Sequence, residues 1–144
     1  MIRPPHADER GAAATELALL VPAFMLILAV MVAGSRIWLA RSAVSQAAGA
    51  GARAASLQRS AGEAEQAAQR TVAANLSDAS LVCQSRSVAV DTSGFAKAAG
   101  VAATVTVRVN CTVSLSDLIL PGMPGMVDAN AVGSSPLDTF RARR

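Results

Sequence analysis

The longest uninterrupted apolar stretch of the chain lies near its N-terminus. Residues Leu17 to Ser35 include no charged side chain over 19 positions. As an α-helix this stretch is about 28 Å long, close to the roughly 30 Å hydrocarbon core of a bilayer. We therefore predict a transmembrane helix over residues 12–35. Pro22 lies inside it, where its missing amide hydrogen is better tolerated than in a soluble helix.

A cleaved secretory signal peptide is the alternative interpretation of this stretch. The apolar region of such a peptide is normally 7–15 residues long and is followed by a small-x-small cleavage site. Here the run is longer, and residues 29–31 and 33–35 form poor cleavage sites. The helical pattern also continues past Arg36, which favours a helix that is retained.

The extension of this helix beyond the membrane is predicted over residues 36–59, which are rich in alanine and lack proline. Small residues recur there at every fourth position: Ala43, Ala47, Gly51 and Ala55. Positions four apart share one helix face, so another backbone can approach this face closely. Two interpretations stay open, packing within the chain's own domain and packing between subunits.

A second helix is predicted over residues 60–78. Ser60 and Glu63 have the spacing of a capping box, in which each side chain accepts a hydrogen bond from the other residue's backbone N–H. Good helix formers follow as far as Leu76, and the polar residues around Asp78 end the helix.

After the second helix the hydrophobic period changes to that of a strand. Between Val101 and Ser116 the odd positions are apolar and the even positions are mostly polar. This alternation predicts a long strand with one buried face. Residues 81–91 predict a partner strand with a bulge near Ser85, because the apolar positions change parity there.

The remaining segments complete a small sheet. Residues 121–125 predict a turn, and Met126–Val132 a short third strand. The sheet is thus expected within residues 79–133, as an antiparallel meander, and the polar residues 134–144 as a flexible tail. Two helices followed by this meander make the predicted fold class α+β.

Composition excludes several classes of function. One His and two Cys cannot supply the ligands of a typical zinc site. The net charge is +3, but the arginines are scattered and the four aromatic residues offer no stacking platform for nucleic acid. The sequence has no phosphate-binding glycine motif, and His6 is the only histidine for a Ser-His-Asp set. We expect no enzyme, metal, cofactor, nucleic acid or small-molecule substrate.

The two cysteines fall on the first two predicted strands. Neighbouring residues on paired strands lie within reach of a disulfide. In an oxidising compartment a bridge between Cys83 and Cys111 would stabilise the fold by about 3–4 kcal/mol in the chain-entropy model. The alternative is two free thiols that act as small core residues. A membrane anchor and an otherwise cysteine-free chain favour the bridge.

Glu16 places a carboxylate directly against the apolar run. A charge within hydrocarbon costs about 2.5–3.5 kcal/mol or more, so such residues tend to be functional. The alternative is that Glu16 stays at the interface, where the positive end of the helix dipole stabilises it. Taken alone, this residue favours the interfacial interpretation.

The whole N-terminal arrangement resembles a type IV prepilin signal. It combines a short charged leader, Gly11, four residues, Glu16 and a long uncharged helix. In that family a prepilin peptidase cuts after the glycine, and the glutamate becomes the fifth residue of the mature chain. The resemblance implies a cytoplasmic leader over residues 1–11, a new N-terminus at Ala12, and a role for Glu16 in subunit assembly.

More narrowly, the chain resembles the TadE-like minor pilins of the tight-adherence (Flp-type) pilus system. The segments that carry this resemblance are Arg10–Gly11, Thr15–Leu19, Pro22, Ala40–Ala48 and Ala52–Ala55. It implies a structural minor pilin or pseudopilin in the cytoplasmic membrane that takes part in pilus assembly, secretion or adhesion. The implied partners are a prepilin peptidase, other pilin subunits, the inner-membrane assembly platform and membrane lipid. The TadE, TadF and TadG types are not separated by this sequence.

The distribution of arginines disagrees with the orientation that this resemblance implies. Arg3 and Arg10 precede the predicted span, whereas Arg36, Arg41 and Arg53 follow closely. The positive-inside rule therefore does not support a cytoplasmic N-terminus. We still expect that orientation, because the leader is too short to form a domain and a disulfide requires an oxidising compartment.

The second functional hypothesis is a single-pass, permanently anchored extracytoplasmic module that binds or senses and does not assemble. The mature N-terminus distinguishes the two hypotheses. A chain that starts at Ala12 supports the pilus subunit, and an intact Met1 supports the anchored module.

Overall fold

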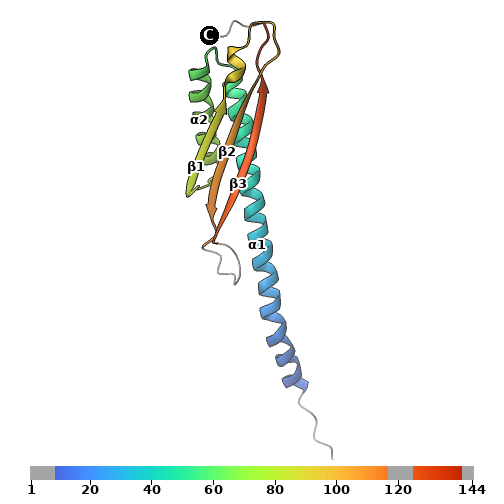
Figure 1. The fold of residues 1–144 in the computed structure, drawn as a ribbon. Helices are drawn as coiled ribbons and strands as arrows, with labels where there is room; N and C mark the ends of the chain where they lie inside the picture. The colour runs from blue at the N-terminus through green and yellow to red at the C-terminus, as the bar shows by residue number, and fades with distance from the viewer. Residues whose placement is uncertain (1–8, 117–124, 141–144) are drawn as a thin grey trace, which may run out of the picture.

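The computed structural model describes residues 9–116 and 125–140, with side chains from residue 16 onward. The elements in this part of the chain are α1 (Glu9–Ser56), α2 (Ala61–Asp78), β1 (Ser85–Asp91), the short 3-10 helix η1 (Ser93–Ala96), β2 (Thr104–Ser114) and β3 (Met126–Pro136). Both α-helices lie on one face of the sheet, and the N-terminal part of α1 projects well beyond it (Figure 1). The predicted α+β class is confirmed.

Helix α1 is one continuous helix of 48 residues. The helix runs through Pro22 without interruption. At about 1.5 Å per residue it is roughly 72 Å long, more than twice the thickness of a hydrocarbon core. The predicted continuation past Ser35 is therefore confirmed, and the helix ends at Ser56.

Helix α2 has a defined signal at each end. At its start the Ser60 side chain accepts a hydrogen bond from the Glu63 backbone N–H at 3.3 Å, as the capping-box spacing predicts. At its end the N–H groups of Ser80 and Leu81 donate to earlier carbonyls of the helix. Ser80 has φ 52°, a left-handed conformation in which helices normally end with glycine.

The sheet has the order β1-β2-β3 with both pairs antiparallel. Central strand β2 alternates as predicted, because Val105, Val107 and Val109 are fully buried against the helices while their even-numbered neighbours lie on the outer face. The strand begins at Thr104 and is shorter than the predicted range.

Small residues form the contact between α1 and the sheet. A Cβ atom on Gly133 of β3 would collide with the backbone of Ala48 and Gly49 in α1. A Cβ atom on Gly51 would lie 2.8 Å from Cγ2 of Val72 in α2. The helix backbone therefore lies against β3 and α2 at distances that only glycine permits.

The third strand is longer than the predicted Met126–Val132. Residues 134–136, expected in a flexible tail, belong to β3, and Pro136 pairs with Thr104. Ser135 is buried and donates its hydroxyl hydrogen to Ser56 Oγ at 3.0 Å. That hydrogen bond explains how a polar residue fills an inward position.

The segment before β1 also differs from the prediction. Residues 81–84 are not part of the strand, which begins at Ser85. The Gln84 N–H donates to the Thr112 carbonyl at 2.8 Å, while Ser85 is the residue paired with Thr112. One hydrogen bond to β2 thus precedes the strand, whose pairing from Ser85 to Asp91 is continuous. Most of the predicted turn at 121–125 lies outside the described residues.

Candidate membrane and assembly surface

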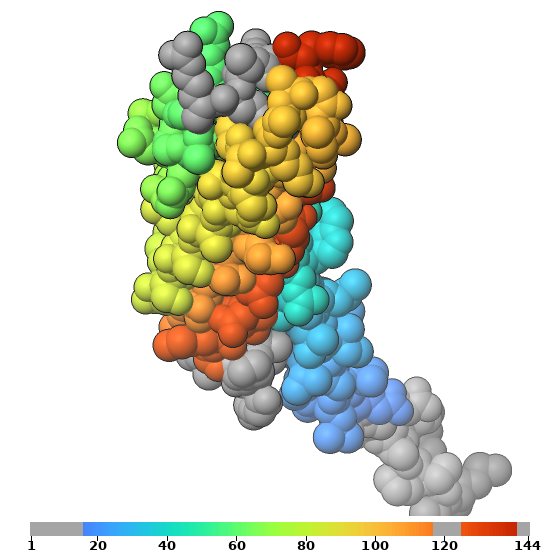
Figure 2. Space-filling view, turned by 45° about the horizontal axis from the view of Figure 1, so that its top comes forward, coloured from blue at the N-terminus to red at the C-terminus, as the bar shows by residue number. Residues whose placement is uncertain are grey.

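The first half of α1 exposes large apolar side chains along its whole length. Within the described residues, α1 is the one helix that is long and apolar enough to cross a membrane. Leu19 is 78% exposed and Met31 66%. Exposure of this much apolar side-chain area to water is unfavourable in free energy. Figure 2 shows this part of the chain projecting away from the folded domain. The helix therefore has the character of a membrane anchor.

The structure places Glu16 on α1, one residue before the uncharged run, with its side chain exposed. Gly11 and Ala12 belong to the backbone of the same helix, but their surroundings lie outside the described side chains. Ala12 and Glu16 are four residues apart, which is about one helical turn. They therefore share one face of the helix.

The stripe of small residues lies within the folded domain. Ala47, Gly51 and Ala55 are buried, and Ala43 is half-buried. The nearest side chains to a Cβ on Gly51 would be Val72 of α2 and Val107 of β2. The sequence left open whether this stripe packs within the chain's own domain or between subunits. In the structure the stripe packs within the domain.

Cys83 and Cys111 form a disulfide, with their Cα atoms 5.3 Å apart and 28 positions apart in the sequence. Cys111 is buried in the central strand β2. Cys83 lies in the segment between α2 and β1, and not on a strand as expected. The bridge therefore ties this connecting segment to the middle of the sheet.

A groove that sequence reasoning missed lies where α1 leaves the domain. We call it the proximal groove; it has a volume of about 750 Å³. Its walls come from three segments: residues 36–46 of α1, residues 75–84 at the end of α2 and beyond it, and residues 113–116 at the end of β2. No sequence pattern marks it, because these segments meet only in the folded chain.

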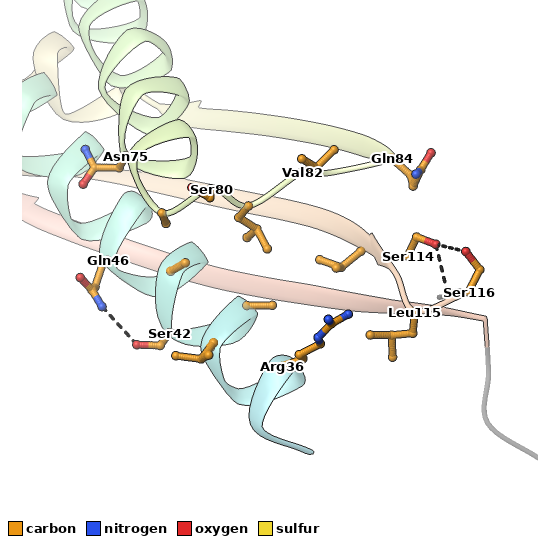
Figure 3. Close-up of a pocket in the computed structure, with 16 residues that line it drawn as sticks. Arg36, Ser42, Gln46, Asn75, Ser80, Val82, Gln84, Ser114, Leu115 and Ser116 are labelled. Carbon is orange, nitrogen blue, oxygen red and sulfur yellow. Dashed lines mark hydrogen bonds between the residues drawn. The ribbon is translucent and has the colours of Figure 1, made fainter. Parts of the chain in front are cut away.

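The polar groups of the proximal groove are partly bonded to one another (Figure 3). Gln46 donates to the Ser42 hydroxyl at 3.1 Å, and the hydroxyls of Ser114 and Ser116 lie 2.8 Å apart. Arg36 is its one charged residue among the described lining residues. The described part of the groove therefore combines apolar walls with a few polar groups.

Outside the groove, the carboxylate of Asp91 takes part in a local hydrogen bond at the end of β1. The described residues contain no group of three or more His, Cys, Asp or Glu side chains that could hold a metal ion. Asp91 accepts a hydrogen bond from the Ser93 backbone N–H at 3.0 Å. Hydrogen bonds from the Ser93 side chain and backbone lower the pKa of the Asp91 carboxyl below its usual value. This carboxylate holds the start of η1.

Comparison with known proteins gives one match. Residues 11–53 match the family model described as TadE-like protein. The matched segment is less than half of the chain, and it includes Gly11, Glu16 and the uncharged run. Neither the curated proteins nor the solved structures give a match. The resemblance found in the sequence is confirmed over this segment, and it supports involvement in the Tad/Flp pilus system.

Proposed function

We propose that this chain, with its TadE-like segment at residues 11–53, is a structural, non-enzymatic minor pilin or pseudopilin. A prepilin peptidase cuts it after Gly11, and residues 17–35 hold it in the cytoplasmic membrane. One observation carries the proposal. The matched segment coincides with a continuous helix whose first half exposes large apolar side chains and whose second half is built into a domain.

The exposed half of α1 accounts for the proposed partners. Its apolar side chains are stable either in lipid or against other helices of the same kind. A subunit of this form can be stored in the bilayer and then packed beside other pilin subunits by an inner-membrane assembly platform. The disulfide supports an extracytoplasmic domain, because such bonds persist in oxidising compartments.

Processing is tested by mass spectrometry of the membrane fraction. The wild-type chain should begin at Ala12. Gly11→Leu should remain uncut, because a bulky residue before the cleaved bond prevents access of the peptidase. Gly34→Leu is the matched control: it makes the same change in the same helix, where a Cβ would meet nothing within 4 Å. A wild-type chain that keeps Met1 would instead favour the anchored module.

Glu16 is proposed to stabilise the packed helices through charge. Cleavage after Gly11 creates a new ammonium group on Ala12. Burying this group among helices without a partner would cost several kcal/mol, and a carboxylate from a neighbouring subunit offsets that cost. Glu16 lies about one turn further along the same face. It can therefore meet the amine of a neighbour displaced by about one turn.

The assembly role is tested by pull-down of the partner pilins. Glu16→Gln should recover less of them than the wild-type chain, while the N-terminus and the disulfide stay unchanged. Glu65→Gln is the matched control, because Glu65 is an exposed carboxylate on α2 that accepts a hydrogen bond from the Gln69 side chain at 3.3 Å. Equal recovery from all three proteins would leave Glu16 as an interfacial residue at the start of the span.

A further inference from the structure

Large apolar side chains are exposed at the end of the domain from which α1 emerges. Trp38 and Leu39 lie on α1, Val82 lies in the segment after α2, and Met126 begins β3. We call these four residues the proximal rim. All four are more than half exposed, and Val82 reaches 75%. Three separate parts of the chain therefore contribute exposed apolar area to one end of the domain.

The rim residues lie at a similar level along α1. Leu39 and Val82 both line the proximal groove (Figure 3), and Met126 is paired in the sheet with Ser114, which lines it too. The uncharged run ends at Ser35, and Leu39 follows about 6 Å further along the helix axis. The headgroup layer of one leaflet is about 5–7 Å thick. The rim thus lies at the height of this layer when the run spans the hydrocarbon core.

The end of the sheet lies beside the last turn of the uncharged run. Ala33 belongs to that run and is nevertheless fully buried, although the side chains of an isolated helix do not cover an alanine completely. One turn later, Ile37 lines a small space together with Leu115 and Val127 at the end of the sheet. The run is only about 28 Å long, so a hydrocarbon core of roughly 30 Å needs all of it. The domain therefore has no room to stand clear of the bilayer.

The rim surrounds α1 and does not form a patch on one side. Ala40 is buried against the domain. At about 100° of rotation per residue, Leu39 lies about 100° and Trp38 about 200° around the axis from Ala40. These two side chains therefore face away from the domain, whereas Val82 and Met126 belong to the domain itself. Lipid surrounds a spanning helix on every side, while one protein partner would cover a single side.

We infer that the proximal rim lies in the interfacial layer of the bilayer, in the leaflet on the domain side, with lipid as its occupant. The tryptophan of the rim suits this layer, because its ring is apolar and its N–H is polar. The inference rests on the proposed function only in that α1 spans a bilayer, and it does not require cleavage at Gly11. The rim gives the domain a second contact with the membrane, which limits how far the domain tilts where α1 leaves the lipid.

The contact is tested with single tryptophans in the full chain, reconstituted at one chain per nanodisc of phosphatidylcholine. Trp38→Phe removes the one native tryptophan. In that background Val82→Trp and Met126→Trp place reporters on two parts of the domain, both at exposed positions that can hold a larger side chain. Phe140→Trp is the matched control: it is exposed and lies beyond the far end of β3, a strand of 11 residues or roughly 35 Å.

Lipid with a nitroxide on the headgroup should quench the reporters at positions 82 and 126 several-fold more than the reporter at position 140. Lipid with the nitroxide in the middle of the acyl chain should quench positions 82 and 126 less than the headgroup label does. The two reporters stand on separate segments, so a local disturbance by one substitution does not affect the other.

The outcomes separate this inference from the proposed function. Quenching at position 82 or 126 no stronger than at position 140 would show that the domain stands clear of the lipid, and would overturn the inference even if the chain begins at Ala12. Quenching that falls when several chains share a disc would show that a second copy displaces the lipid, and would overturn lipid as the occupant. A chain that keeps Met1 but shows strong quenching at both positions would retain the inference and contradict the pilin proposal.

Discussion

The two halves of α1 are one helix in two environments. Between residues 17 and 32 the side chains are mostly large and exposed, whereas Val44, Ala47, Ala48 and Ala52 are fully buried. Both halves are apolar, so hydrophobicity alone does not distinguish them. The difference lies in size, because leucine and valine are the commonest large residues of the first half, and alanine and glycine dominate the second.

Residue size therefore indicates which solvent each half meets. Small side chains let the second half approach a sheet and another helix at backbone distance, where close packing gains dispersion energy. Large side chains in the first half would prevent such an approach, and they suit the loosely ordered hydrocarbon of a bilayer. The following predictions test whether the halves are energetically separate.

The largest expected effect comes from removing the disulfide. The double variant Cys83→Ala/Cys111→Ala should lose about 3–4 kcal/mol of domain stability, since the bridge closes a loop of about 29 residues. Urea unfolding of the full chain in detergent micelles, followed by circular dichroism, measures this loss. Hydrogen exchange should show the first half of α1 equally protected in both proteins.

The oxidised state itself has an independent check. Intact mass measured without reductant should be two hydrogens lighter than after reduction. Alkylation of both thiols without reductant would show that the bridge is absent from the cellular protein. It would also remove the main argument for an extracytoplasmic domain.

Gly133→Ala tests the closest contact of the second half. The new methyl group would meet the backbone of Ala48, which cannot move aside as a flexible side chain can. Overpacking of this kind should cost about 2–3 kcal/mol in urea unfolding. Gly49→Ala is the control, because a Cβ there meets nothing within 4 Å. It should stabilise α1 by up to about 1 kcal/mol through helix propensity.

A matched pair of valines compares the two halves directly. Val44 is fully buried in the domain, whereas Val30 is 52% exposed on the first half. Val44→Ala should lower the unfolding free energy of the domain by about 1–2 kcal/mol through lost burial and the cavity left behind. Val30→Ala makes the same change in helix propensity and should leave the domain unchanged. Equal losses would show that the halves unfold as one unit.

The smallest effect is expected from Asp91, at the end of β1. Its lowered pKa means that the folded state favours the charged carboxylate. The stability that this carboxylate adds is present above the unfolded pKa, and it is lost as the pH falls through the lowered value. Asp91→Asn should thus be slightly less stable than the wild-type chain at neutral pH and equally stable near pH 2. A difference that grows on acidification would contradict the assignment.

Sequence patterns predict the elements whose environment is uniform. The uncharged run, the N-cap at Ser60 and the alternation along β2 all correspond to observed structure. In each case one physical requirement acts on every position of the segment. The hydrocarbon thickness, the helix start and the two faces of a sheet are such requirements.

Predictions from the sequence fail where contact with a neighbouring element determines the residue type. The end of β3 has glycine and serine at inward positions, because Ala48 needs space beside Gly133 and Ser56 bonds Ser135. The end of β3 therefore lacks the alternation of apolar and polar residues that marks a strand, and its sequence predicts a flexible tail instead. Phe95 is similarly buried within a short helical turn that the sequence presents as a loop. The proximal groove depends on three distant segments and has no local signal.

The contact of Gly133 with Ala48 also restricts how α1 can be oriented against β3. With backbone against backbone, α1 cannot rotate about its own axis without separating from β3. The contact therefore restricts the rotation of α1 about its own axis, and this restriction applies to the whole continuous helix. With about 100° of rotation per residue, Glu16 lies about 40° around the axis from Ala48 and about 48 Å along it. The contact with β3 therefore restricts the rotational position of Glu16 as well, although the two lie far apart along α1.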